Sequence, residues 1–294
     1  MLMKNKSIKS YTYLYLFGFS LVLSGILSLS FPVLAQQTED YEVWDQISET
    51  MGLITEMDYQ LEDKDEKKLL IRLGVIGGIA PEYRGADEYR FSYAPNIHIV
   101  WNDWLYLKGR KLGVELFDKG GFYGGAFVRY NGGRSENNDG LEGLGDISRT
   151  FTSGAYLNYR YQGLRLKSEV RHDFLNEGHG TLAIFRLGSR LPWNDPLFYL
   201  GVETTWASRE HMRTFFGVNN LQGLASGLTR YQPDAGMRDV SVNLSSAYKF
   251  SQHWSVAAQL RYQYLLGDAA DSPIVRASGS RHGLVAGMGL SYEF

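Results

Sequence analysis

The chain has 294 residues, of which 33 are glycine, 20 are tyrosine and none is cysteine, and its formal net charge is -2. A mean hydropathy of -0.26 excludes a protein with several apolar membrane helices, because such helices would raise the mean well above zero. The absence of cysteine excludes disulfides, thiolate metal sites and thiol nucleophiles. The near-neutral charge gives no global attraction to nucleic acid, and the glycine and tyrosine content favours strands and turns.

The first 35 residues have the layout of a cleaved secretory signal peptide. Three lysines within the first nine residues precede an uncharged stretch, Ser10 to Ala35, that is rich in Leu, Phe and Tyr. Small or β-branched residues occupy the -3 and -1 positions of a cut after Ala35. An uncleaved single-span anchor is the alternative, because the stretch is long enough to cross a bilayer. We expect cleavage, which places residues 36–294 outside the cytoplasm.

Residues 36–68 form an acidic segment before the first expected strand. Four apolar side chains recur in it at helical spacing: Trp44, Ile47, Met51 and Ile54. This spacing is compatible with a short amphipathic helix, whereas the charged run 61–68 is typical of a solvated tether. We interpret residues 36–68 as a periplasmic lead-in, with a plug or a docking arm as the functional alternative.

From residue 69 onward, apolar residues recur at every second position. In the last stretch, Leu284, Met288 and Leu290 share one face, and the opposite face carries mostly glycine, serine and glutamate. Such alternation suits a strand between lipid and a crowded polar interior. The predicted strands are 69–80, 90–101, 104–108, 111–117, 121–131, 149–161, 163–173, 179–190, 197–207, 239–250, 253–265 and 282–294. Most exceed the globular mode of about 5–6 residues and match the roughly 9–11 residues of a tilted membrane crossing.

The connections between these strands alternate in length. Short ones lie at 102–103, 118–120, 162, 191–196 and 251–252, and longer ones at 81–89, 132–148, 208–238 and 266–281. Short turns at one end and long loops at the other are typical of outer-membrane barrels, whose short turns face the periplasm. The sequence therefore predicts an all-β fold, a closed antiparallel up-and-down transmembrane β-barrel of about twelve strands (69–294) in the outer membrane of a Gram-negative cell.

The stretch 104–117 is compatible with one strand or with two. Its apolar residues keep one parity throughout, as a single strand requires. A single strand would place Lys108 and Arg110 in lipid at mid-span, however, at a cost of about 2–4 kcal/mol each. It would also leave an odd number of strands and put the chain ends on opposite sides of the membrane. We therefore predict a turn at 109–110.

The same alternation predicts a basic barrel interior. The inward-facing set is Arg72, Arg129, Arg160, Arg165, Lys167, Arg171, Arg186, Arg190, Lys249 and Arg261, opposed by Glu115, Glu169, Glu203 and Glu293. One interpretation is a narrow pore that favours anions. The other is a packed, salt-bridged interior that carries nothing. We favour the second, since twelve strands lie between the filled eight-stranded barrels and the open sixteen-stranded ones.

The histidines and the glycine-rich loop give no sign of catalysis or of metal binding. A hydrolase built on His172 and Asp173 with a serine has no support in the spacing, and no pair of histidines has the spacing of a metal site. Glycines at 140, 143 and 145 lie beside an Asn-Asn-Asp run and indicate a turn rather than a nucleotide site. We predict no enzyme activity, no metal and no cofactor.

The C-terminal residues resemble the signal that the outer-membrane assembly machinery reads. Phe294 is the last residue, and Tyr292, Leu290 and Met288 precede it at alternate positions. We therefore expect the barrel assembly machinery and outer-membrane lipid among the partners of this chain.

Four loop motifs resemble the MipA/OmpV family of Gram-negative outer-membrane proteins. They are Pro81-Glu82-Tyr83-Arg84-Gly85-Ala86-Asp87, Phe215-Phe216-Gly217-Val218, Gly227-Leu228-Thr229-Arg230-Tyr231 with Gly236 shortly after, and Asp271-Ser272-Pro273-Ile274-Val275. The resemblance runs from about Leu69 to the C-terminus. The motif residues are expected to shape turns, Gly85 and Gly217 through positive φ and Pro273 by fixing a bend.

The resemblance implies a non-catalytic function. The family's namesake is described as a scaffold that links a murein lytic transglycosylase to a murein synthase, and other members as porin-like or stress-responsive proteins. No catalytic residues come with the family. The resemblance thus implies a scaffold or structural barrel associated with murein (peptidoglycan) synthesis and remodelling enzymes. A narrow channel for small anionic solutes is the alternative that the basic interior raises.

Overall fold

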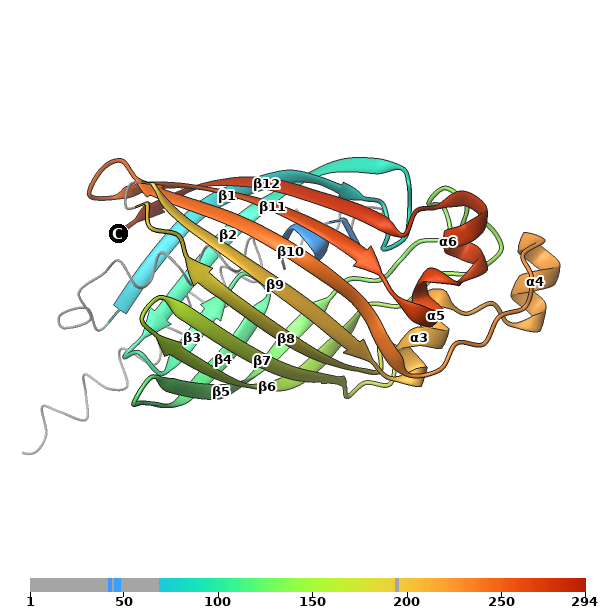
Figure 1. The fold of residues 1–294 in the computed structure, drawn as a ribbon, viewed down its shortest axis with the longest axis horizontal. Helices are drawn as coiled ribbons and strands as arrows, with labels where there is room; N and C mark the ends of the chain where they lie inside the picture. The colour runs from blue at the N-terminus through green and yellow to red at the C-terminus, as the bar shows by residue number, and fades with distance from the viewer. Residues whose placement is uncertain (1–41, 44, 49–68, 194–195) are drawn as a thin grey trace, which may run out of the picture. The chain divides into compact units, whose positions relative to one another are not determined.

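The computed structural model describes residues 42–43, 45–48, 69–193 and 196–294 (Figure 1). In this part of the chain, twelve β-strands form one closed antiparallel barrel. Each strand pairs with its neighbours in sequence, and β1 (Leu69–Pro81) closes the barrel against β12 (His282–Glu293). The predicted fold, an all-β up-and-down barrel of twelve strands, is confirmed. The predicted signal peptide, residues 1–35, lies outside the described residues.

The remaining strands are β2 (Tyr89–Trp101), β3 (Leu105–Lys108), β4 (Lys111–Lys119), β5 (Phe122–Asn131), β6 (Thr150–Tyr161), β7 (Leu164–Asp173), β8 (Thr181–Arg190), β9 (Leu197–Ala207), β10 (Gly236–Lys249) and β11 (Trp254–Leu265). Their outward faces are apolar, with Phe91, Leu116 and Met288 among the most exposed side chains. The inward faces carry small and polar residues. This division matches a barrel wall with lipid outside, because the alternation of the sequence follows the pleat of the strands.

Four short helices lie in the longer loops of the described chain: α3 (Arg209–Phe216), α4 (Asn220–Ser226), α5 (Gly267–Ala270) and α6 (Pro273–Ser278). The sequence predicts only loops there. Ser208, Asn219 and Ser272 begin three of these helices, each accepting a hydrogen bond from a backbone N–H of the first turn. None of the described helices is long and apolar enough to cross a membrane.

The stretch 104–117 is divided between two strands. Gly109, with φ of 56°, sits at the tip of the β3–β4 hairpin, and Leu105–Lys108 pairs with Lys111–Val114 across it. The predicted turn at 109–110 is confirmed. Arg110 faces the interior rather than lipid, as the cost of a charge in the bilayer requires.

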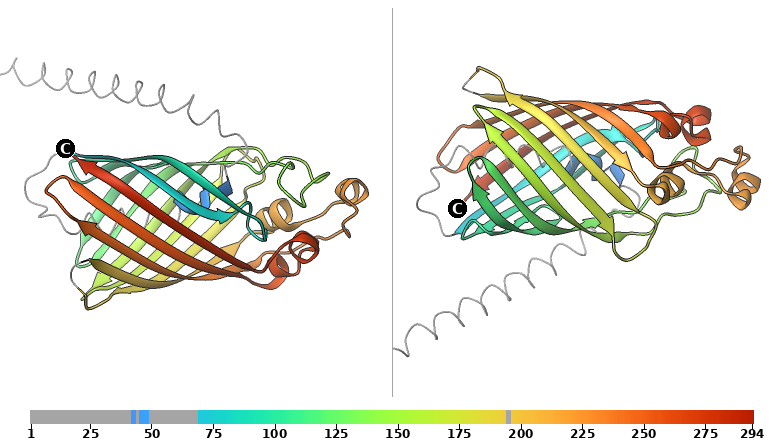
Figure 2. Two further views of the ribbon diagram at one scale, coloured as in Figure 1. Left: turned by 90° about the horizontal axis from the view of Figure 1, so that it is seen from above. Right: turned by 60° about the horizontal axis from the view of Figure 1, so that its bottom comes forward.

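The connections sort to the two ends of the barrel. The longer loops, 82–88, 132–149, 174–180, 208–235 and 266–281, lie at one end, and the short turns, 102–104, 120–121, 162–163 and 250–253, lie at the other with residues 191–193 (Figures 1 and 2). The 109–110 turn is the exception, because it lies within the barrel wall. We call these the loop end and the turn end. The C-terminus lies at the turn end (Figure 1). In outer-membrane barrels the turn end faces the periplasm.

Candidate functional site

Ion pairs between strands, some adjacent and some farther apart in the sheet, line the barrel interior. Arg72 on β1 donates from Nη2 to Oε2 of Glu293 on β12, over 2.8 Å, and both side chains are buried. Lys249 Nζ lies 3.7 Å from the same carboxylate oxygen. This cluster holds together the strands at which the barrel closes.

A second cluster centres on Glu203 of β9. Its carboxylate accepts a hydrogen bond from Arg186 on β8 and forms an ion pair with Arg261 on β11, with Nη2 and Oε1 2.7 Å apart. Arg261 also lies 3.8 Å from Asp239 on β10, and Asp239 accepts from Arg238 Nε over 2.6 Å. The five side chains range from 0% to 14% exposed, so the network is shielded from water.

The other basic residues have partners of more varied kinds. Lys111 Nζ lies 2.7 Å from Glu169, whose other oxygen is 3.9 Å from Arg171. Arg160 pairs with Asp118 over 2.6 Å. All ten predicted basic residues lie on the inward register of their strands, and three acids beyond the predicted four oppose them. Asp45, Asp118 and Asp239 also face the interior.

Toward the turn end the predicted basic residues differ in exposure. The Arg165 guanidinium stacks 5.3 Å above the Tyr199 ring, and Arg190 is exposed. Lys167 lies opposite Arg186 in the register of β7 and β8, two residues farther from the turn end than Arg165.

A short helical segment lies inside the barrel. Residues 42–43 and 45–48, which we call the inner helix, are drawn in blue within the barrel wall in Figures 1 and 2. Val43 and Ile47 are each 1% exposed. The described part of the acidic segment is therefore packed within the barrel, and it differs from the solvated lead-in that we expected. The charged run 61–68 lies outside the described residues.

The inner helix is held by polar contacts at both ends. Gln46 Nε2 donates to the carbonyl oxygen of Pro81 over 2.8 Å, and Glu42 accepts from the N–H of Arg84 over 3.0 Å. Asp45 accepts from the N–H of Gly132 over 2.9 Å.

Two cations also face Asp45. Its carboxylate pairs with Arg110, and Arg129 Nη2 lies 3.4 Å from it. The acidic residues of the inner helix thus neutralise part of the basic interior, which explains why this segment does not stay in solvent.

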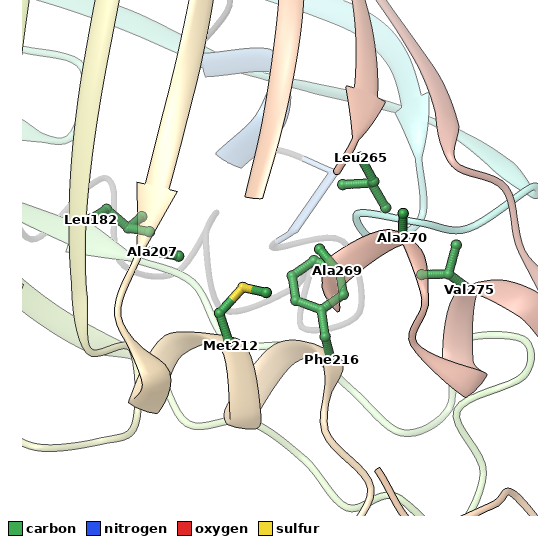
Figure 3. Packing of buried hydrophobic residues seen from close by; sticks show 8 residues of the cluster. All are labelled: Leu182, Ala207, Met212, Phe216, Leu265, Ala269, Ala270 and Val275. Carbon is green, nitrogen blue, oxygen red and sulfur yellow. The ribbon is translucent and has the colours of Figure 1, made fainter. Parts of the chain in front are cut away.

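The loops at the loop end pack against each other and form what we call the loop cap, residues 82–88, 132–149, 208–235 and 266–281. One cluster joins α3, α5 and α6 to the barrel rim (Figure 3); its residues are Leu182, Ala207, Met212, Phe216, Leu265, Ala269, Ala270 and Val275. A second cluster joins all four loops; its residues are Tyr83, Ala86, Leu141, Leu144, Val218 and Ile274. A small hydrophobic core therefore covers the loop end of the barrel.

The predicted motif residues come together in this loop cap. Pro81 ends β1, Gly236 begins β10, and Tyr231 exchanges two backbone hydrogen bonds with Val218. The Tyr83 hydroxyl donates to the carbonyl oxygen of Asp139 over 3.2 Å. The motifs, which are far apart in the chain, are thus brought to one place by the barrel.

Two glycines of the motifs serve the cap in different ways. Gly85 has φ of 101°, as expected, and a Cβ there would lie 2.7 Å from Cγ2 of Val275. Gly217 has φ of -84°, so the expected positive φ is wrong. It ends α3 where a Cβ would collide with the carbonyl group of Arg213.

The last motif begins α6. Ser272 accepts at Oγ from the N–H of Ile274, and its hydroxyl donates to the carbonyl oxygen of Phe216 over 2.7 Å. Pro273 occupies the first helical position, where a missing N–H costs nothing. The motif thus ties α6 to the end of α3.

Two histidines beneath the cap are held in the neutral form. Arg238 Nη1 donates to His211 Nε2 over 3.1 Å, so His211 Nδ1 carries the proton and donates to the carbonyl oxygen of His179 over 2.9 Å. Burial, and then the Arg238 charge, hold the pKa of His211 well below its usual value. Burial also lowers the pKa of His179, whose Nε2 donates to the carbonyl oxygen of Ser148.

The residues considered for catalysis are engaged in structure. His172 hydrogen-bonds Thr181 on the adjacent strand, whereas Asp173 accepts from Thr150 and from the backbone of the 174–180 loop. Over the described residues, no group of three histidine, aspartate or glutamate side chains could hold a metal ion.

The residues of the predicted assembly signal, at alternate positions from Met288 to Phe294, lie on the outer face of β12 and at its end. Met288, Leu290 and Phe294 are exposed, and Tyr292 packs edge-on against Trp254. They offer an apolar surface beside the turn end.

Comparison with known proteins places the chain in a family. The family model for MltA-interacting protein MipA matches residues 73–294. The chain belongs to the MipA family. Its membership agrees with the resemblance carried by the loop motifs, and the protein is an outer-membrane β-barrel.

Two curated relatives match part of the chain at moderate sequence identity. The MltA-interacting proteins of Escherichia coli (strain K12) and Shigella flexneri are each 32% identical over 152 residues, which cover 51% of this chain and 59% of theirs. Two solved barrel structures are similar to this chain with low TM-scores and low sequence identities. The translocator domain of autotransporter NalP from Neisseria meningitidis has a TM-score of 0.36 and 11% identity, with 88% of this chain and 100% of that one covered. A Pseudomonas aeruginosa FadL homologue has a TM-score of 0.37 and 10% identity, with 77% and 90% covered.

Proposed function

We propose that this MipA-family protein is a closed, non-catalytic outer-membrane barrel that acts as a scaffold for murein-remodelling enzymes. The observation that carries the proposal is the occupied interior. Shielded ion pairs and the inner helix occupy the barrel interior, and the loop cap covers its loop end. A barrel that carries no solute acts through its surfaces, and the relatives are named for an interaction with MltA.

The surface that such enzymes would contact is the turn end. Murein lies in the periplasm, which the short turns of an outer-membrane barrel face. Trp193 in the 191–196 turn is 58% exposed, and Trp104 and Phe250 are exposed in two other turns. Exposed aromatic residues are the kind that anchor protein interfaces. A murein lytic transglycosylase and a murein synthase are the partners that we propose for this end.

The rival function is a channel for small anionic solutes, which the basic interior suggested. Glu203, Glu293 and Asp45 each form ion pairs with two basic side chains of the interior, so part of the positive charge is already neutralised. Such pairing supports the filled interior over the pore.

Two measurements on the full mature protein test the proposal. In planar bilayers, protein whose folding is verified by heat-modifiable gel mobility should give no discrete conductance steps. Anion-selective steps that change in the Arg165→Glu and Arg171→Glu variants would refute the closed scaffold and support the channel.

Affinity capture of purified murein lytic transglycosylase tests the partner directly. Trp193→Ala should weaken capture, whereas Leu224→Ala, on exposed α4 at the other end, should not. Equal capture by both variants would show that Trp193 does not contribute to docking. Absence of capture by the unmodified protein would refute the murein lytic transglycosylase as a partner.

A further inference from the structure

The barrel wall is interrupted in its loop-end half. β2 pairs with β1 over its whole length, but it pairs with β3 only from His98 to Trp101. The hairpin tip ends level with Ile97, whose carbonyl oxygen accepts from Gly109 N–H over 2.8 Å. Beyond that tip, no strand of the described chain covers the free edge of β2. From Ile97 to Tyr89 the uncovered edge is about 27 Å of strand.

The sequence of β2 is suited to a permanent free edge. Residues of an antiparallel strand direct their N–H groups alternately to its two neighbours. Ile97 bonds to the hairpin side, so Pro95, two residues away, has its backbone on that same side, where β2 has no strand neighbour. Proline lacks an N–H and is accepted in strands at such edges. Because a proline also hinders the addition of a further strand, a partner's strand is a poor occupant.

The interruption is framed on all sides. On its turn-end side lies the tip of the β3–β4 hairpin, where the Arg110 carbonyl oxygen accepts from Tyr130 N–H of β5 over 3.1 Å. On its loop-end side, the 132–149 loop crosses to the β1–β2 loop, with Asp139 N–H donating to Glu82 over 3.3 Å. We call this gap in the strand pairing of the described chain, between β2 and the end of β5, the wall window.

The inner helix lies directly behind the wall window and contacts its frame. On the β1–β2 side it bonds to the carbonyl oxygen of Pro81. On the β5 side, the Asp45 carboxylate meets Arg129 and the N–H of Gly132, and at the hairpin tip it meets Arg110. One carboxylate thus sits among two guanidinium groups and a backbone N–H beside an opening in the wall.

We propose that the wall window is a lateral binding site for a membrane lipid with a phosphate-bearing head group, and that Asp45 occupies the head-group position in this structure. Arginine pairs with phosphate by the same forked hydrogen bonds with which it binds carboxylate. Because the window lies in the loop-end half, it faces the outer leaflet. Phe91 and Tyr93, 62% and 58% exposed on the outer face of β2, flank it for contact with acyl chains.

The proposal is independent of the scaffold function, because it concerns the membrane-facing wall and not the turn end. A head group that enters through the window does not have to pass the loop cap. The same cations could instead bind free phosphate from solution, so the experiment separates the two sources.

Native mass spectrometry of the full mature protein, released from vesicles, measures the bound lipid. The vesicles contain phosphatidylcholine with or without phosphatidic acid. Unmodified protein should retain phosphatidic acid in preference to phosphatidylcholine. Asp45→Asn should raise the affinity for phosphatidic acid about tenfold, since the competing charge-assisted hydrogen bonds are weakened. Adding Arg110→Gln and Arg129→Gln to Asp45→Asn should abolish that gain.

The matched control is Arg209→Gln, which removes an exposed arginine of α3 and should leave lipid binding unchanged. Equal retention of both lipids by the unmodified protein and by Asp45→Asn would overturn the proposal. So would binding of inorganic phosphate to Asp45→Asn that phosphatidic acid does not displace, because the site would then serve a soluble anion. Heat-modifiable gel mobility verifies that each variant is folded, and the preference of the unmodified protein does not depend on any substitution.

Discussion

Removing the charge of Glu203 tests whether the barrel interior is shielded from water or open to it. Glu203 is 3% exposed and forms ion pairs with Arg186 and Arg261, which lie on two different strands. Glu203→Gln keeps the shape of the side chain and removes its charge. Two buried guanidinium groups then face an amide, and Asp239, 3.8 Å from Arg261, is the nearest remaining carboxylate in the cluster.

The expected loss follows from the shielding. Removal of one partner of a buried ion pair costs about 3–5 kcal/mol, because the other charge stays buried and uncompensated. Asp239 offsets part of this for Arg261, so we expect a loss of about 3 kcal/mol in the free energy of unfolding. In a hydrated channel the same pairs would be screened and would contribute only about 0–1 kcal/mol.

Urea unfolding of the barrel in phospholipid vesicles, followed by tryptophan fluorescence and heat-modifiable gel mobility, measures the difference. The matched control is Asp234→Asn, which breaks the pair of Arg209 and Asp234, whose side chains are 63% and 67% exposed. We expect no measurable change for the control. If Glu203→Gln unfolds at the same urea concentration as the control, the interior is hydrated and the closed barrel loses its physical basis.

Three further predictions concern the loop cap. Because the pKa values of His179 and His211 are lowered, the unfolded cap binds protons that the folded cap does not. The contribution of these histidines to cap stability is therefore constant above about pH 6.5 and falls below it, by up to about 1.4 kcal/mol per pH unit for each. Hydrogen exchange of the loops, corrected for intrinsic rates, should quicken at pH 5, and slower exchange would contradict this. Gly85→Ala should cost about 1–3 kcal/mol, because φ is positive and the new Cβ meets Val275, and it should speed proteolysis of the loops. Ser272→Ala should cost about 1–2 kcal/mol by removing a helix cap and a buried hydrogen bond, and unchanged loop exchange would refute that contribution.

Much of the fold could be predicted from the sequence because a barrel strand carries its own signal. The period of two in β12 distinguishes its lipid face from its interior face without knowledge of any neighbour. The cost of placing Arg110 in lipid was enough to divide 104–117 into two strands. The helices of the loop cap had no such signal, because α3 is stabilised by contacts of Met212 and Phe216 with residues far away in the chain.

The candidate site could be predicted only in part. The parity of each strand indicates which basic side chains face inward, but the partner of a side chain depends on the register between strands. Arg72 and Glu293 are 221 positions apart, and only the closure of β1 against β12 brings them together. The helical spacing around Asp45 is compatible with an amphipathic helix, but it does not indicate which surface the helix packs on, so the pairing of Asp45 with Arg110 could not be predicted.

The closed axis and the open wall are consistent with each other. Passage along the barrel axis would require the loop cap, the inner helix and the Glu203 cluster to move. Access through the wall window requires the Asp45 carboxylate to leave two guanidinium groups and the N–H of Gly132. A phosphate can accept from the same donors, so the interactions lost by Asp45 are replaced in kind. A ligand therefore meets a much smaller barrier in the plane of the membrane than along the axis, while the turn end stays free for proteins in the periplasm.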